Sequence, residues 1–407
     1  MIDVFSMFIL LGTTIFLGYT CSIIFKKTQI PDIIWLLVFG LLIGPVFNLI
    51  DRSIFISLSP ILAAFALLII LFDAGLEMNV YNVLRQFPRS ILLSIVGISL
   101  TIVSIAVSSV FLFNFDWIRA LLLGSIIGGP SSAIVISILQ KLNIREDVRV
   151  ILDLESVLTD PVDVVLTIAL VQIYVSTLPL SSIVGNIFSA FSIGAVVGVV
   201  SGLTWLILLT KIKDNFDYML TLAILLLIYA FVESIGGSGA ISALMFGLVL
   251  GSGKIFSKAL KFKKEFSINP ELKRFHEEIT FFVKSFFFVT MGLIVSINSN
   301  FILQGIVITI VIALMRVVVV YISTYRMKLT SFEINIMRVV IPQGLATAVM
   351  SYVPMIYGIK DAEIFLNIAF IVILATIVYT TVAMKVLYVR NKPSNKVDIK
   401  TKPKELR

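Results

Sequence analysis

Four carboxylates crowd into twelve residues of an otherwise apolar stretch, 152–163, which reads LDLESVLTDPVD. At about 100° per residue, these acids and their hydroxyl neighbours fall on two adjoining faces of a helix. The first face carries Asp153, Ser156, Asp160 and Asp163, and the second carries Glu155 and Thr159. A charge at the centre of a membrane helix costs roughly 2.5–3.5 kcal/mol, so buried acids of this kind are functional candidates. The two faces predict that the acids on them have two different roles.

Asp160 has oxygen donors in the turn of helix that precedes it. Thr159 and Ser156 supply hydroxyl oxygens, and Pro161 leaves the carbonyl of Val157 without its usual helical donor. A carboxylate among neutral oxygens is a site for a hard cation. Because burial disfavours the charged form of an empty carboxylate, we expect a proton and a cation to compete for Asp160. The alternative is an acid satisfied by a basic neighbour.

Glu155 calls for a different interpretation. Arg316 stands alone in the middle of the apolar run 301–325, and an unpaired guanidinium there would be very costly. We therefore expect a structural ion pair between Glu155 and Arg316, in preference to ion transport by Glu155. Asp153 and Asp163 lie nearer the ends of their apolar stretch and are expected to border aqueous vestibules.

The elements that position these residues are membrane helices. The chain has 407 residues, of which 59% are hydrophobic and 14% charged, with a mean hydropathy of +1.08. Soluble domains carry about a quarter charged residues. Apolar runs long enough to cross a bilayer predict an all-α polytopic protein with 13 transmembrane helices. Their ranges are 4–25, 31–50, 55–73, 91–113, 118–140, 150–176, 183–210, 218–234, 237–253, 278–297, 301–325, 332–356 and 364–388.

Lys and Arg are distributed unevenly between the two sides of the predicted bundle. The loops after odd-numbered spans and the C-terminal tail hold 25 of them, whereas the N-terminus and the other loops hold three. Since cytoplasmic loops carry the excess, the N-terminus is expected outside and the C-terminus in the cytoplasm. The net charge of +8 is then cytoplasmic surface and not a nucleic-acid footprint.

The domain organisation is simple. The longest polar stretches are the loop 253–278 and the tail 391–407, and both are too short for a separate domain. We predict one membrane domain over 1–390 and a basic cytoplasmic tail over 391–407. Cys21 and His276 are the only cysteine and histidine, so neither a zinc site nor a Ser-His or Cys-His catalytic pair is available, and we expect neither an enzyme nor a cofactor.

Short motifs recur at a displacement of seven spans. FGLLIG at 39–44 and FGLVLG at 246–251 match at four of six positions, and Gly-Leu recurs at 75–76 and 292–293. An odd displacement inverts the second copy. The pattern predicts inverted repeats formed by spans 1–6 and 8–13.

Spans 5 and 12 hold corresponding places in these repeats, and each is interrupted. The first interruption contains Gly129 and Pro130, followed by Ser131 and Ser132, and the second contains Pro342, Gln343 and Gly344. Paired interruptions in inverted halves indicate a transporter's binding site near the midplane, where half-helix ends face an ion. We count both serines as candidate oxygen ligands. The alternative is that Gly and Pro merely kink these helices.

Several segments resemble one known family. LESVLTDP at 154–161 resembles the Glu-Ser-x-x-Asn-Asp segment of the monovalent cation:proton antiporters of the sodium/proton exchanger (NhaP-like) type, and LFDAGLE at 71–77 and FFFVTMGL at 286–293 resemble further family segments. The resemblance implies that Asp160 is the transporting carboxylate and that Glu155 and Arg316 form an ion pair. It also implies that the two interrupted helices cross, and that the protein is a homodimer in the cell membrane with a scaffold beside a moving core.

The departures from the family pattern bear on selectivity. Thr159 stands where the family usually has Asn, and a single Asp at this place suggests electroneutral one-for-one exchange. Ser131 stands in place of a family Asp and Gln343 in place of an Arg, so one acid and one base are lost together. The expected function is exchange of Na⁺ for H⁺, with K⁺ or Li⁺ as alternative cations. A sodium-coupled symporter of organic anions and a cation channel are the rival classes.

Overall fold

The computed structural model describes residues 4–28, 31–50, 52–77, 80–139, 144–175, 180–211, 217–259, 270–325 and 327–390, and the regular secondary structure in these ranges is helical. The first half of the chain forms α1 Val4–Thr28, α2 Asp32–Leu41, the π-helical turn η1 Leu42–Val46, α3 Arg52–Glu77, α4 Val80–Phe113, α5 Trp117–Ile126, α6 Ser132–Leu139 and α7 Glu146–Val175. The second half forms α8 Leu180–Lys211, α9 Asp217–Ser234, α10 Gly239–Gly251, α11 Gly253–Ala259, α12 Pro270–Ile294, α13 Ser299–Ser323, α14 Ser331–Val339, α15 Leu345–Met350, α16 Val353–Ile356 and α17 Glu363–Arg390.

Local chemistry explains several helix starts. The Asp116 carboxylate accepts a hydrogen bond from the backbone N–H of Arg119 and caps α5. Thr330 and Glu333 form a reciprocal capping box at the start of α14. These contacts satisfy N–H groups that the first turn of a helix leaves without partners. The helices therefore begin where the polar residues at the ends of the apolar runs place them.

Each predicted span overlaps one or more of these helices. Within the described residues, five helices are long and apolar enough by themselves to cross a membrane: Leu92–Phe113, Val148–Val175, Phe188–Leu209, Ser299–Ser323 and Glu363–Val389. The total of thirteen crossings stays a prediction, because several spans are built from short or interrupted helices. The predicted tail 391–407 lies outside the described residues.

One predicted loop is wrong in part. The stretch 253–278 contains α11 and the first turns of α12, so its described residues are largely helical. His276 is 1% exposed, and its ring packs against that of Phe72 with 4.8 Å between the ring centroids. The first turns of α12 therefore contribute buried packing against α3, which charge and hydropathy along the chain did not reveal.

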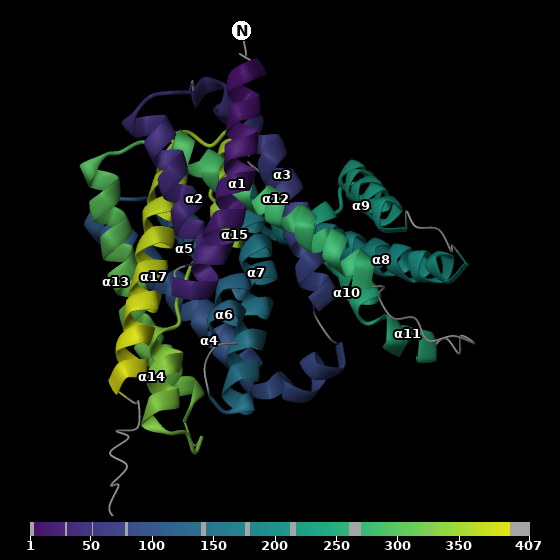
Figure 1. Cartoon of the computed structure of the whole chain (residues 1–407). Helices are drawn as coiled ribbons and strands as arrows, with labels where there is room; N and C mark the ends of the chain where they lie inside the picture. Colours follow the sequence, from purple (N-terminus) through teal and green to yellow (C-terminus); the bar gives the residue numbers. More distant parts are fainter. Residues whose placement is uncertain are drawn as a thin grey trace, which may run out of the picture.

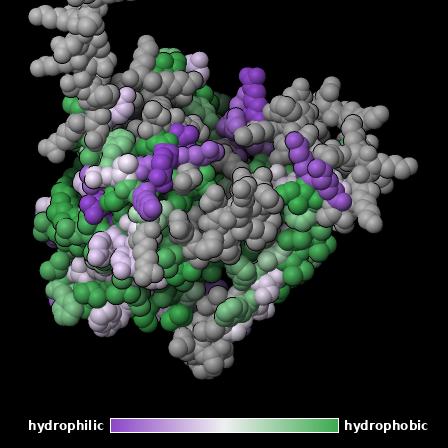
Figure 2. Space-filling view, turned by 90° about the horizontal axis from the view of Figure 1, so that it is seen from below, coloured by the Kyte–Doolittle hydropathy of each residue, from purple (hydrophilic) through white to green (hydrophobic). Residues whose placement is uncertain are grey.

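The two ends of the described chain lie at opposite ends of the molecule. In Figure 1, α1 starts at the top beside the N-terminus, and α17 ends at the bottom. Figure 2 views the lower end, where hydrophilic side chains gather and hydrophobic side chains cover the surrounding flanks. An odd number of membrane crossings requires this placement of the ends, and lipid-facing flanks require apolar side chains.

Two close helix contacts have the form that an inverted repeat requires. A Cβ on Gly40 of α2 would lie 3.0 Å from the Cα of Gly292 of α12. A Cβ on Gly75 of α3 would lie 3.1 Å from the carbonyl carbon of Gly247 of α10. The repeat displacement exchanges α2 with α10 and α3 with α12, so it maps one contact onto the other. Glycine is needed at all four positions because the backbones nearly touch.

Candidate ion-binding site

The two interrupted helices meet at their interruptions. Helix α5 ends at Ile126 and α6 starts at Ser132, while α14 ends at Val339 and α15 starts at Leu345. The backbone N–H of Ser131 donates to the carbonyl of Pro342 at 2.8 Å, which joins the two unwound segments directly. Gly344 leaves room for this approach, since a Cβ there would lie 2.2 Å from the Ser131 hydroxyl.

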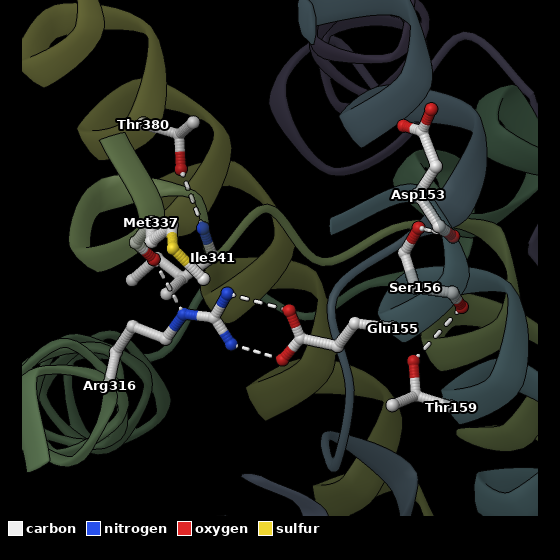
Figure 3. Close-up of polar contacts among 8 residues, drawn as sticks. All are labelled: Asp153, Glu155, Ser156, Thr159, Arg316, Met337, Ile341 and Thr380. Atoms are coloured by element: carbon white, nitrogen blue, oxygen red, sulfur yellow. Dashed lines mark hydrogen bonds and ion pairs between the residues drawn. The ribbon is translucent and has the colours of Figure 1, made fainter. Parts of the chain in front are cut away.

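Helix α17 supplies partners for the second interruption. The Thr376 hydroxyl accepts a hydrogen bond from the backbone N–H of Gln343 at 3.0 Å. The Thr380 hydroxyl accepts from the N–H of Ile341 at 3.3 Å, and this bond is drawn in Figure 3. Unwound backbone at membrane depth requires such partners, because no water is present to replace the lost helical bonds. Two threonines one helical turn apart thus stabilise this break.

Asp160 of α7 lies at the start of α6. Its Oδ2 accepts a hydrogen bond from the hydroxyl of Ser132 at 2.7 Å and lies 3.4 Å from the backbone nitrogen of the same residue. The side chain is 6% exposed, and among the described residues it has no basic partner. A helix N-terminus favours negative charge, so α6 gives Asp160 partial compensation without a full counter-charge.

Glu155 and Arg316 form a bidentate ion pair between α7 and α13 (Figure 3). The Nη2–Oε2 distance is 2.8 Å, and Nη1 donates to Oε1. Arg316 Nε donates to the carbonyl of Met337 in α14 at 2.8 Å. Both side chains are buried. Bidentate geometry with a third bond leaves little of either charge uncompensated.

Ser156 and Thr159 are buried, but their hydroxyls are engaged with their own helix. Ser156 donates to the carbonyl of Asp153 at 2.9 Å, and Thr159 donates to the carbonyl of Ser156 at 3.0 Å. Thr159 packs against Gly129, where a Cβ would lie 2.4 Å from the Thr159 Cβ. The structure therefore places Thr159 at the break and directs the Ser156 hydroxyl away from Asp160.

A small cavity separates the ion pair from the interruptions. Its volume is about 20 Å³, which is room for about one water molecule. Its lining includes Glu155, Arg316, Thr159, Pro130 and Gln343. The Gln343 amide oxygen accepts a hydrogen bond from the Thr347 hydroxyl at 2.7 Å. The cavity is thus bordered both by the ion pair and by residues of the two interruptions. Asp160 is not among its lining residues.

Asp163 is the residue that sequence reasoning placed wrongly. It is 3% exposed, and it does not border an aqueous vestibule. Its carboxylate lies against the first interruption, where a Cβ on Gly128 would be 2.3 Å from Oδ1 and one on Gly129 would be 3.0 Å from Oδ2. The signal that could have found it was present, because Asp163 follows Asp160 by three residues and shares its helical face.

Comparisons with known proteins agree with this geometry. The family model described as "Sodium/hydrogen exchanger, transmembrane" matches residues 12–389. "Probable Na(+)/H(+) antiporter 2" of Methanocaldococcus jannaschii is 30% identical over 313 residues, which cover 70% of this chain and 71% of that protein. "K(+)/H(+) antiporter NhaP2" of Shewanella sp. strain ANA-3 is 26% identical over 388 residues. The alignment covers 92% of this chain and 65% of that protein.

A solved structure has the same fold. The sodium proton antiporter MjNhaP1 from Methanocaldococcus jannaschii, solved at pH 8, gives a TM-score of 0.79 at 19% identity. The match covers 93% of this chain and 97% of that chain. The NhaP-like resemblance seen in the sequence is confirmed, and the chain belongs to the sodium/hydrogen exchanger family, a family of multi-pass membrane transporters and not of enzymes.

Proposed function

We propose that the protein exchanges a monovalent cation, Na⁺ in the first instance, for one H⁺ across the cell membrane. The proposal rests on the burial of Asp160 without a counter-charge. This carboxylate is 6% exposed and lies at a helix N-terminus, with Ser132 as its hydrogen-bond partner and no basic partner among the described residues. A buried acid without a counter-charge is stable when it holds a proton or a cation.

Exchange follows from the cost of the empty site. With a proton or an alkali ion on Asp160, the site carries the same net charge in both cases and can move between its two facings by alternating access. An empty, charged carboxylate resists that movement because it must stay desolvated without compensation. One ion then leaves only when the other replaces it, which gives electroneutral one-for-one antiport. Ser132, Ser131 of the same break and Thr159 of α7 are the neutral oxygen donors that we assign to the site.

The identity of the transported cation is inferred from the names of the relatives. One relative is named as a Na⁺/H⁺ antiporter and another as a K⁺/H⁺ antiporter. The fold neighbour is named as a sodium proton antiporter. Sodium is therefore our first candidate, potassium the second, and lithium the third. The resemblance to the family also supports a homodimer with the N-terminus outside and the C-terminus in the cytoplasm.

A sodium-coupled organic anion symporter needs free positive charge near the breaks. Arg316 is bound by Glu155 and by the carbonyl of Met337. Arg338, near the second interruption, donates from Nη1 to Asn335 of its own helix at 3.4 Å, and its buried Nε has no hydrogen-bond partner. The uncompensated acid Asp160 and the compensated Arg316 favour a cation, whereas the Arg338 guanidinium keeps the symporter as the second class to test.

The test is exchange in proteoliposomes against a pH gradient, with Na⁺, K⁺ and Li⁺ supplied separately and no organic solute present. We expect cation-driven proton movement in the wild type and none above empty liposomes in Asp160→Asn. Proton movement that requires an organic anion would support the symporter, and a linear single-channel current would support a channel. Either result would overturn the proposed antiport.

A further inference from the structure

Asp163 has a buried carboxylate oxygen without a partner. Its side chain is 3% exposed, and Oδ1 has no hydrogen-bond partner. The described residues include no Lys or Arg in an ion pair with it. Burying a polar oxygen without a hydrogen bond is costly, and burying an unpaired charge costs far more. A structural role alone leaves that cost unexplained.

The carboxylate is aimed at the same break that Asp160 contacts. The Asp163 carboxylate lies against the backbone of Gly128 and Gly129, where a Cβ would be 2.3 Å from Oδ1 and 3.0 Å from Oδ2 respectively. Asp160 accepts from Ser132, which ends the break. The unwound segment between these residues therefore has a carboxylate at each end. Residues three apart on a helix are neighbours, so both acids face one region.

We propose that Asp163 supplies a second carboxylate oxygen to the transported cation, which would bind between Asp160, Asp163 and the unwound segment Gly128–Ser131. This inference rests on the proposed function and adds a ligand to its site. Hard cations take carboxylate and carbonyl oxygens as ligands, and an interrupted helix presents such carbonyls. The unpartnered Oδ1 is the atom that the ion would satisfy.

The assignment defines a role different from that of Asp160. Since the proposed exchange moves one charge each way, Asp163 contributes an oxygen ligand and not a second transported proton. Loss of its charge should therefore weaken cation binding and leave turnover intact once the cation is saturating. Loss of the Asp160 charge should abolish turnover at every cation concentration.

Two variants test the assignment independently. Asp163→Asn keeps the shape of the side chain and removes its charge. Gly128→Ala leaves the acid in place but adds a methyl group that would lie 2.3 Å from Oδ1, so that the carboxylate must shift. Gly12→Ala is the matched control, because a Cβ at Gly12 has no neighbour within 4 Å. Exchange is measured in proteoliposomes over a range of Na⁺, K⁺ and Li⁺ concentrations.

The expected result is a rise of about tenfold in the half-saturating cation concentration for both variants, as the loss of one charge-assisted ligand predicts. The maximal rate should stay near that of the wild type, and Gly12→Ala should match the wild type in both quantities. Cation-dependent thermal stabilisation of the purified protein, measured in parallel, should shift to the same higher concentrations.

Two outcomes overturn the assignment. The first is unchanged half-saturation in Asp163→Asn. The second is complete loss of exchange in a folded variant whose cation-dependent stabilisation is unchanged, because a ligand role requires weaker binding. If Asp163→Asn fails to fold, unchanged half-saturation in Gly128→Ala is the deciding result. Absence of exchange in the wild type would instead overturn the proposed function itself, so the two failures are distinguishable.

Discussion

Helix α7 carries two buried acids that the protein treats in opposite ways. Glu155 and Asp160 are five residues apart, a rise of about 7.5 Å along the helix. Glu155 faces a guanidinium that binds both of its oxygens, whereas Asp160 faces the start of α6 and a serine hydroxyl. Both are nearly inaccessible to solvent. Burial therefore does not distinguish these two acids, and the presence of a counter-charge does.

The two acids also differ in whether they are neutral without a bound ion. The Glu155–Arg316 pair is neutral as it stands and joins α7 to α13 and, through Met337, to α14. It has no reason to exchange ions during the cycle. In the proposed exchange, Asp160 reaches neutrality only by binding a proton or a cation, so its occupancy would vary while that of the pair stays constant.

The largest expected effect is on turnover at the uncompensated acid. Asp160→Asn should reduce exchange in proteoliposomes to the level of empty liposomes, because a neutral amide cannot hold a proton and a cation in turn. The fold should survive, since Asn can still accept the hydrogen bond from Ser132 and no basic residue of the described chain loses a partner. Thermal unfolding of the purified protein checks this. Substantial exchange by the folded variant would remove the contrast with Glu155.

The next effect is on stability at the compensated acid. Arg316→Ala leaves Glu155 buried without its partner and should cost about 3–5 kcal/mol of the free energy of unfolding. Thermal unfolding in detergent measures the loss. The double variant Glu155→Leu with Arg316→Leu is the control, and it should recover much of that stability because apolar residues replace the pair. If the single variant is as stable as the wild type, the pair is not the structural element described above.

A smaller effect is expected at the second interruption. Thr376→Val removes the hydroxyl that accepts from the N–H of Gln343 and should cost about 1–3 kcal/mol, the penalty for an unsatisfied buried donor. Thr381→Val is the matched control, since the Thr381 hydroxyl donates only to Ile377 of its own helix. Equal stability of the two variants would show that the break does not depend on α17.

The smallest effect is expected at Asp153, the first acid of the segment. Asp153 is half-buried and points away from the Glu155–Arg316 pair in Figure 3. Asp153→Asn keeps the backbone carbonyl that Ser156 uses, and Asp153 lies seven residues, a rise of about 10.5 Å, from Asp160 along the helix. Half-saturation for the cation should match the wild type. A large loss of exchange in this variant would extend the ion-handling region beyond the break.

How far the sequence predicts this site depends on whether a residue's partner is unique. Arg316 is the only charge in the middle of its span, so its pairing with Glu155 follows from cost alone. The two interruptions follow from Gly and Pro at matched places. For Asp163, the sequence shows that it shares a helical face with Asp160, but its contact with Gly128 and Gly129 depends on the path of the break between α5 and α6, which the sequence does not give. Likewise, the packing of His276 on Phe72 arises from tertiary contact between α12 and α3.

The central claim is that Asp160 holds a proton or a cation, and that each displaces the other. The most direct measurement is the number of protons released when Na⁺, K⁺ or Li⁺ is added to the purified protein in weakly buffered detergent solution. We expect one proton to be released for each cation bound in the wild type and none in Asp160→Asn. Cation binding without proton release in the wild type, or equal release from Asp160→Asn, would contradict it.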